Sequence, residues 1–268
     1  MSRATLALAI STGAALAALW GCAASTPPAE APSKELATDS DQTATDRRAR
    51  VRMELASGYY SRGQYETALD EVKLALAVKP DLPDAYNLRG LVYQSMGEDK
   101  LAEENFKRAL QLSPRDPDIM HNYGWFLCQS RRIPEALVQF QQAIATPRYA
   151  GLSRSLMTQG VCQARTGAYA DAERSLVRSY ELDPTSPVTA FNLADVLYRR
   201  GEFERARFYI GRVNAVQEYT SAQTLWLAAR IENKMGNQRG ARDYSRQLRA
   251  RFPQSPESMA AERGRYDD

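Results

Sequence analysis

A spacing of about 34 residues that recurs along the chain constrains its fold more than any other feature. Residues 84–114 show the unit, in which two short amphipathic segments flank a break at residues 96–99. Gly97 in this break is suited to end a helix, and Pro114 prevents the second segment from continuing. The second segment carries one apolar stripe at helical spacing, formed by Ala102, Phe106, Ala109 and Leu110. A helical hairpin this short cannot bury its own apolar face, so several copies must stack.

Further copies of this unit lie before and after residues 84–114. Alanine recurs at steps of 34 to 36 residues, at Ala68, Ala102, Ala136, Ala172, Ala206 and Ala241. A turn residue stands five positions before each alanine, at Gly63, Gly97, Arg131, Gly167, Gly201 and Gly236. The longer steps indicate short insertions in the third and fifth linkers. The pattern resembles the tetratricopeptide repeat, TPR, which implies an all-α superhelical solenoid of about six helix-turn-helix repeats over residues 47–254.

The N-terminus reads as an export signal followed by a lipid attachment site. A short apolar stretch ends in Leu19-Trp20-Gly21-Cys22, which resembles the bacterial lipobox. We therefore expect residues 1–21 to be a lipoprotein signal peptide and Cys22 to be acylated, although an ordinary secretory signal with an unrelated cysteine is the alternative. Ala23 follows the cysteine where an aspartate is the usual mark for inner-membrane retention, so an outer-membrane anchor on the periplasmic face is expected. Residues 22–46 are rich in Pro, Ser, Thr and Ala and predict a disordered, flexible tether.

The C-terminal residues 255–268 are expected to form a cap and a tail. Ser255 is suited to cap a helix and Pro256 to occupy its first turn, so a short capping helix is predicted. Residues 264–268 are expected to fray. The formal net charge of +3 and the mixed signs do not favour a nucleic-acid partner. The basic run at residues 47–52 is either the solvated start of the first helix or a contact with anionic headgroups.

Two cysteines remain once Cys22 is assigned to lipid. Cys128 lies four residues after Gly124, and Cys162 lies two residues after Gly160, the matching glycine of the next repeat. Two residues rotate a helix by about 200°, so the two thiols lie on opposite flanks of adjacent helices. This placement, in an exported protein, predicts a disulfide between Cys128 and Cys162. Two buried, reduced thiols are the alternative.

The sequence favours a non-enzymatic protein. His121 is the only histidine, and no glycine-rich phosphate loop is present. Acidic residues are scattered over helix faces without a pair that shares a cleft. We therefore predict no catalytic residue, no metal site, no cofactor and no small-molecule substrate.

The TPR resemblance also implies a binding surface, because the first helices of TPR units line the concave side. Residues just before and after the Gly90-type position point into that groove. The positions predicted to line the groove are Asn87, Leu91, His121, Trp125, Met157, Phe191, Tyr198 and Trp226. Such an aromatic groove suits an extended or helical apolar segment of a protein partner. Alternatively, some of these rings fill the core between neighbouring helices.

Two further stretches narrow the resemblance. Residues 121–128 read H-N-Y-G-W-F-L-C and residues 160–167 read G-V-C-Q-A-R-T-G. Together with the lipobox they resemble the PilW/PilF family of type IV pilus biogenesis lipoproteins. That resemblance implies a pilotin-like role in which the partners are the outer-membrane secretin or other pilus assembly proteins. It makes Asn122 and Phe126, beside Trp125, further candidates for partner binding, although both residues could equally hold the repeat together. A TPR lipoprotein adaptor for other envelope machinery, such as peptidoglycan enzymes, is the second interpretation.

Overall fold

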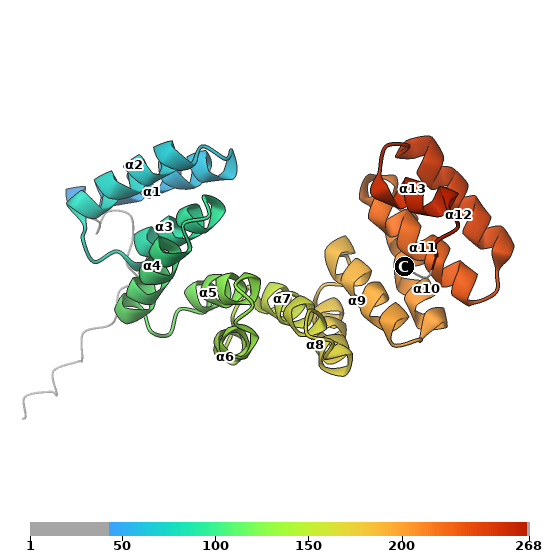
Figure 1. Cartoon of the computed structure of the whole chain (residues 1–268). Coiled ribbons are helices and arrows are strands. Elements are labelled where there is room, and N and C mark those ends of the chain that lie inside the picture. Colours follow the sequence, from blue (N-terminus) through green and yellow to red (C-terminus); the bar gives the residue numbers. More distant parts are fainter. Residues whose placement is uncertain (1–42, 267–268) are drawn as a thin grey trace, which may run out of the picture. The chain divides into compact units, whose positions relative to one another are not determined.

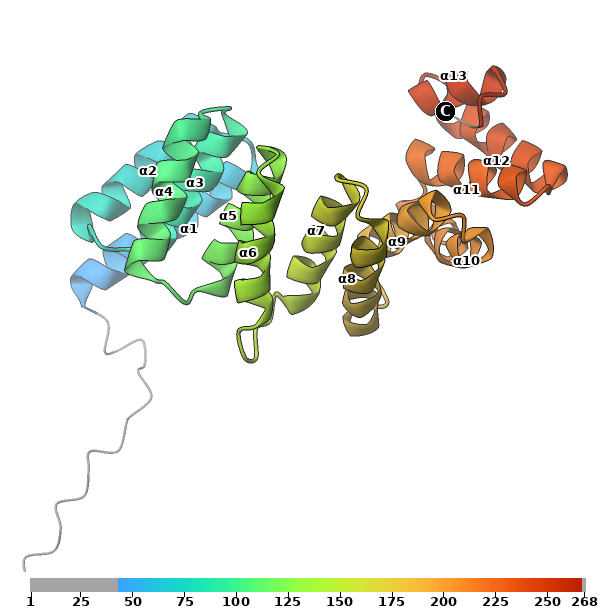
Figure 2. The same ribbon diagram turned by 60° about the horizontal axis from the view of Figure 1, so that its bottom comes forward.

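The computed structural model describes residues 43–266, and the regular elements in this range are all helical (Figures 1 and 2). Residues 1–42, with the predicted signal peptide, Cys22 and most of the tether, lie outside the described residues. The first, or A, helices of the repeats are α1 (Ala44–Ser61), α3 (Pro83–Ser95), α5 (Pro117–Gln129), α7 (Leu152–Ala164), α9 (Pro187–Arg199) and α11 (Ala222–Lys234). The second, or B, helices are α2 (Tyr65–Val78), α4 (Asp99–Leu112), α6 (Ile133–Ile144), α8 (Tyr169–Leu182), α10 (Phe203–Asn214) and α12 (Gln238–Arg251). A short 3-10 turn, η2 (Gln217–Tyr219), and a last helix, α13 (Pro256–Glu262), complete an all-α TPR array, which confirms the predicted fold.

The helices pack in chain order. Each A helix contacts the B helix of its own repeat, and each B helix contacts the next A helix. Consecutive A helices also contact one another, from α1 with α3 to α9 with α11, whereas no extensive contact joins consecutive B helices in the described chain. The A helices therefore stand side by side along one face of the array.

The recurring alanines mark where the two helices of a repeat approach most closely. The six B-helix alanines are each at most 1% exposed. On the A helix, Gly90 faces the aromatic ring of Phe106, and a Cβ atom at Gly90 would lie 2.9 Å from that ring. The absence of a side chain at Gly90 thus allows Phe106 to fill the interior of its own repeat.

The turn between the A and B helices requires a left-handed backbone conformation. Gly97 has a φ of +79° in the second repeat. In the third repeat Arg131 takes the same place with a φ of +60°, as the repeat alignment predicts. The longer third and fifth linkers are also present, and the fifth contains η2.

The boundary between tether and repeats differs from the prediction. Helix α1 begins at Ala44, so residues 44–46, which the sequence analysis assigned to the tether, are helical. The physical reason is a local cap, because the Thr43 hydroxyl accepts a hydrogen bond from the Asp46 backbone N–H at 3.1 Å. The Lys79 ammonium lies 2.9 Å from the Asp46 carboxylate and fixes this first turn to the end of α2.

The C-terminal cap forms as predicted, but residues 264–266 after it are packed on repeat six instead of frayed. Ser255 caps α13 by accepting a hydrogen bond from the Ser258 N–H at 3.1 Å. Beyond α13, the ring of Tyr266 stacks on Trp226 with centroids 5.3 Å apart. The Tyr266 hydroxyl lies 3.0 Å from the Ser245 hydroxyl, and its carbonyl accepts a hydrogen bond from Arg230 Nε at 3.0 Å. Residues 264–266 are therefore held on repeat six.

Candidate functional site

A disulfide joins the A helices of repeats three and four. Cys128 on α5 and Cys162 on α7 are bonded, with Cα atoms 5.9 Å apart, as the opposite-flank argument predicts. Both residues are fully buried. The bond fixes the spacing of α5 and α7, which carry several of the residues predicted to line the groove.

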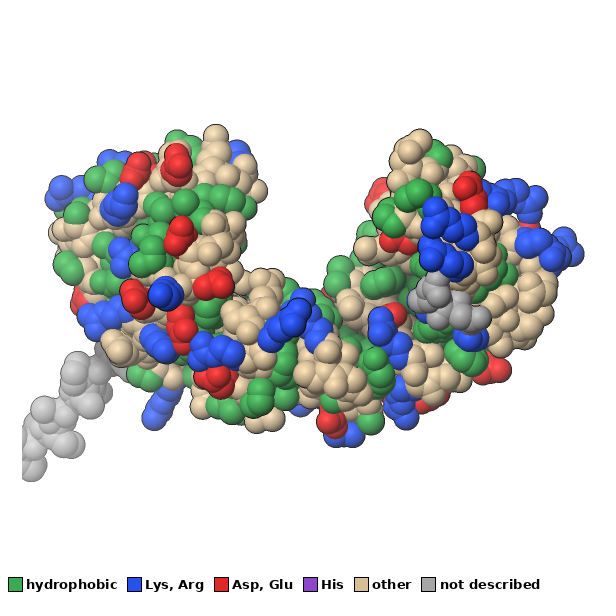
Figure 3. All heavy atoms as spheres, in the orientation of Figure 1, with side chains coloured by type: hydrophobic (Ala, Val, Ile, Leu, Met, Phe, Trp, Pro, Cys, Tyr) green, Lys and Arg blue, Asp and Glu red, His purple; other side chains and the backbone are tan. Residues whose placement is uncertain are grey.

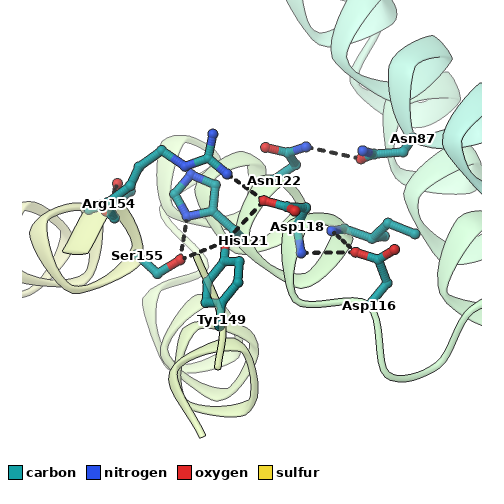
Figure 4. A network of polar contacts seen from close by, with 10 residues as sticks. Asn87, Asp116, Asp118, His121, Asn122, Tyr149, Arg154 and Ser155 are labelled. Carbon is teal, nitrogen blue, oxygen red and sulfur yellow. Dashed lines mark hydrogen bonds and ion pairs between the residues drawn. The ribbon is translucent and has the colours of Figure 1, made fainter. Parts of the chain in front are cut away.

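Side-chain hydrogen bonds link neighbouring A helices at several levels. The Gln94 amide donates to the Gln129 carbonyl oxygen at 3.0 Å. Nearer the start of the same helices, Asn122 Nδ2 donates to Asn87 Oδ1 at 3.2 Å (Figure 4). No other hydrogen bond to these two asparagine side chains is found within residues 43–266. Asn87 Nδ2 and Asn122 Oδ1 are therefore available as one donor and one acceptor, which is the pattern needed to bind a peptide backbone.

His121, which was predicted to line the groove, is buried between repeats three and four. It is 7% exposed, and its Nδ1 lies 2.9 Å from the Ser155 hydroxyl of α7 (Figure 4). Burial, assisted by the nearby Arg154 guanidinium, lowers the pKa of His121 to about 4. Arg154 itself forms a 2.6 Å ion pair with Asp118, which also accepts a hydrogen bond from the Tyr149 hydroxyl at 3.1 Å. The network links α5, the third linker and α7 around a neutral imidazole.

Phe126 and Tyr198 also differ from the groove prediction, because both are buried. Phe126 is 2% exposed and packs against Phe106 of the preceding repeat, with ring centroids 5.6 Å apart. It lies two residues after Gly124, which faces its own B helix, so a rotation of about 200° turns Phe126 toward the neighbouring repeat. Tyr198 is 9% exposed and lies beneath the Arg230 guanidinium at 4.6 Å. Both rings hold repeats together, the alternative that the sequence analysis left open.

The remaining predicted residues differ in how far they are open to a partner. Trp226 is covered by Tyr266. Trp125 is partly exposed and lies 5.7 Å from the Arg165 guanidinium of the next A helix. Besides Trp226, the predicted positions that are partly exposed are Asn87, Leu91, Asn122, Trp125, Met157 and Phe191, on α3, α5, α7 and α9. We refer to these six residues as the A-helix face.

Comparison with known proteins agrees with this architecture. TPR family profiles match residues 57–97 ("TPR repeat") and residues 83–116 and 223–255 ("Tetratricopeptide repeat"). The type IV pilus assembly protein PilF of Pseudomonas aeruginosa is 30% identical over 205 residues, which cover 76% of this chain and 81% of PilF. The chain belongs to the PilF/PilW family of type IV pilus assembly TPR proteins.

Solved structures of the PilF/PilW family share the fold of this chain. The crystal structure of PilW, described as a widely conserved type IV pilus biogenesis factor, has a TM-score of 0.75 and 30% identity, covering 80% of this chain and 98% of PilW. The structure of Pseudomonas aeruginosa PilF has a TM-score of 0.74 and 27% identity, covering 83% of this chain and 100% of PilF. These relatives are described as type IV pilus assembly or biogenesis proteins.

This PilF/PilW family member also has an exposed apolar patch that the sequence analysis missed. Val51, Leu55 and Leu74 are 50%, 42% and 45% exposed, and they line one groove between α1 and α2. Three arginines of the basic run line the same groove, namely Arg47, Arg48 and Arg52. The i, i+4 spacing of Val51 and Leu55 is visible in the sequence. Periodicity alone, however, assigns an apolar pair at this spacing to the core, so it does not predict an exposed patch.

On the face shown in Figure 3, side chains of both signs alternate with apolar ones. Within residues 43–266, no helix is both long and apolar enough to cross a bilayer. In the same range, His, Cys, Asp and Glu residues do not gather in groups of three or more that could hold a metal ion.

Proposed function

We propose that this PilF/PilW family member is a non-enzymatic scaffold, anchored by lipid at the periplasmic face of the outer membrane, that supports localisation and multimerisation of the pilus secretin. The observation that carries the proposal is the identity to a type IV pilus assembly protein across 81% of its length. This match covers most of the array, whereas the TPR family profiles cover only residues 57–116 and 223–255.

The A-helix face is the proposed binding surface for the secretin or another pilus assembly protein. The Asn87 and Asn122 amides offer a donor and an acceptor to a backbone lying across the A helices. Beside them, Leu91 and Trp125 provide partly buried apolar surface. Because the disulfide fixes α5 against α7, this surface is preorganised and loses little conformational entropy when it binds.

A test of the face combines two substitutions with a matched control. The variant Asn122→Ala with Trp125→Ala should bind less of the partner and should reduce secretin multimers and twitching in cells. The control is Val138→Ala, because Val138 is 49% exposed and lies on the B helix α6 instead of on an A helix. Normal secretin multimers in cells that lack this protein altogether would contradict the proposed function.

The lipid anchor is tested separately through Cys22. Replacement Cys22→Ser should abolish incorporation of radiolabelled palmitate and release the protein from the outer-membrane fraction. If the unmodified protein carries no fatty acid, the anchoring part of the proposal is wrong, while the scaffold function can still be assessed through the A-helix face.

A further inference from the structure

The fifth linker gives this array a pocket that a repeat of minimal length would not have. The linker joins α10 to α11 and contains η2, whereas the linker between α8 and α9 spans only residues 183–186. Val216 and Tyr219 from the longer linker line a pocket of about 250 Å³ together with Pro184 from the shorter linker and Pro187 at the start of α9. This volume is below the roughly 300–1,000 Å³ typical of small-molecule sites. It suits a side chain of a bound polypeptide.

Exposed apolar side chains surround this pocket. Phe208 on α10 is 57% exposed, and Val188, next to Pro187, is 53% exposed. Within the pocket wall, Tyr219 is 43% exposed and Val216 is 40% exposed. Large apolar groups left in water at this density usually mark a protein contact. The patch is formed by α10, the first turn of α9 and two inter-repeat linkers, and it contains none of the six residues of the A-helix face.

Arg212 supplies the only charge among the residues that line the pocket. Its guanidinium lies 5.8 Å from the Tyr180 ring centroid and 5.9 Å from that of Phe208. Tyr209 contacts both rings edge-on, each with centroids 5.1 Å apart, so the arginine rests on a packed aromatic frame. Within the described residues Arg212 forms no ion pair with a carboxylate.

The chemistry of the pocket therefore combines an apolar wall with one positioned, unneutralised guanidinium. Tyr180, whose hydroxyl is buried without a hydrogen-bond partner, forms part of the same wall. A guanidinium binds a carboxylate with two parallel hydrogen bonds, and these are stronger where neighbouring apolar groups exclude water. Charge complementarity thus selects an acidic group beside an apolar one.

We propose that this pocket is a second protein-docking site, which binds a partner segment carrying a large apolar side chain next to a carboxylate. The apolar side chain enters between Pro184 and Tyr219, and the carboxylate pairs with Arg212. The site lies between repeats four and five and is independent of a partner bound on the A-helix face.

The test uses N-acetyl-leucine as the probe and N-acetyl-leucinamide as its uncharged counterpart. Each is titrated into the isotopically labelled full chain in detergent micelles at neutral pH, and backbone NMR shifts are followed. We expect N-acetyl-leucine to shift the backbone amide signals of Thr185, Val213, Val216 and Tyr219. It should also bind about tenfold more tightly than N-acetyl-leucinamide, because one charge-assisted hydrogen bond changes the dissociation constant by about that factor. No shifts at these residues up to the solubility limit, or equal affinities for acid and amide, would overturn the proposal.

Two variants then separate charge from packing. Arg212→Gln should weaken binding of the acid about tenfold and leave binding of the amide unchanged. Arg246→Gln, on an exposed arginine of α12, is the control and should bind the acid as the unmodified chain does. An equal loss of acid binding in both variants would show a general charge effect and contradict the proposal. The comparison of acid and amide on the unmodified chain holds even if Arg212→Gln fails to fold.

Discussion

Gly90 shows how a single missing methyl group sets the spacing of two helices. Replacement Gly90→Ala would place a Cβ atom 2.9 Å from the ring of Phe106, which is fully buried and has no room to withdraw. Overpacking of this kind costs about 1–3 kcal/mol, while the higher helix propensity of alanine returns at most about 1 kcal/mol. We expect a net loss of stability, measured as a lower urea midpoint at unchanged slope.

The matched control is Gly211→Ala on α10. Gly211 is helical, and apart from the adjacent residues and the backbone of its own helix no atom lies within 4 Å of the position that its Cβ would occupy. Only the higher helix propensity of alanine then applies, so the free energy of unfolding of this variant should rise by up to about 1 kcal/mol. If both variants shift the midpoint in the same direction, the close approach at Gly90 does not govern the packing of the repeat.

His121 makes stability depend on pH. The pKa of His121 is about 4 in the folded chain and near 6.5 when unfolded, because burial and Arg154 disfavour the imidazolium. The unfolded chain therefore binds more protons between pH 4 and pH 6.5. The stabilising contribution, roughly 3 kcal/mol, is present above pH 6.5 and is lost as the pH falls through this range. Chemical denaturation at a series of pH values measures it.

The variant His121→Gln removes the titrating group and keeps a side chain that can hydrogen-bond to Ser155. Its free energy of unfolding should change much less between pH 6.5 and pH 4 than that of the unmodified chain. Glu103, whose pKa is lowered to about 2 by hydrogen bonds from Lys107, Arg132 and Tyr123, titrates in a lower range. If the free energy of unfolding of His121→Gln still falls between pH 6.5 and pH 4 as it does in the unmodified chain, groups other than His121 cause the pH dependence.

At the scale of helices, the sequence predicts where the helices and turns lie better than it predicts which side chains are exposed on them. The stripe around Ala102 and the turn at Arg131 follow from spacing within the chain, and both are present. Phe126 and Tyr198 were misplaced because their surroundings come from neighbouring repeats, which the pattern of one repeat does not contain. The short segment that carries Tyr266 has no periodicity, so its contact with Trp226 had no signal in the sequence.

The disulfide ties two such elements together and is expected to matter for stability. It closes a loop between residues 34 positions apart, a length for which the chain-entropy model gives about 3–4 kcal/mol. Reduction of the unmodified chain should lower its melting temperature by several degrees. Calorimetry with and without reductant measures the change.

The double variant Cys128→Ala with Cys162→Ala separates the bond from general effects of the reductant. It should melt near the temperature of the reduced, unmodified chain and show no further response to reductant. An unmodified chain that melts at the same temperature in both conditions would mean that α5 and α7 are held by packing alone.

For the described array as a whole, contacts run only between neighbouring repeats. The A helices contact the next A helix, and no extensive contact reaches further along the chain. The free energy of unfolding of such an array is close to the sum of the stabilities of the single repeats and of the interfaces between neighbouring repeats. Parts of the array can therefore unfold separately. The third linker network and the disulfide add coupling at the centre, between α5 and α7.

This arrangement predicts that a local defect stays local. In Gly90→Ala, a loss of 1–2 kcal/mol corresponds to roughly 5–30-fold faster amide hydrogen exchange, and we expect it in α1 to α6. Helices α11 to α13 should exchange at the unmodified rate, because they share no contact with α3 or α4. Gly211→Ala should slow exchange around α10 and leave α1 to α4 unchanged. Faster exchange along the entire array in Gly90→Ala would instead require one cooperative unit, in which the central disulfide and the His121 network transmit strain from end to end.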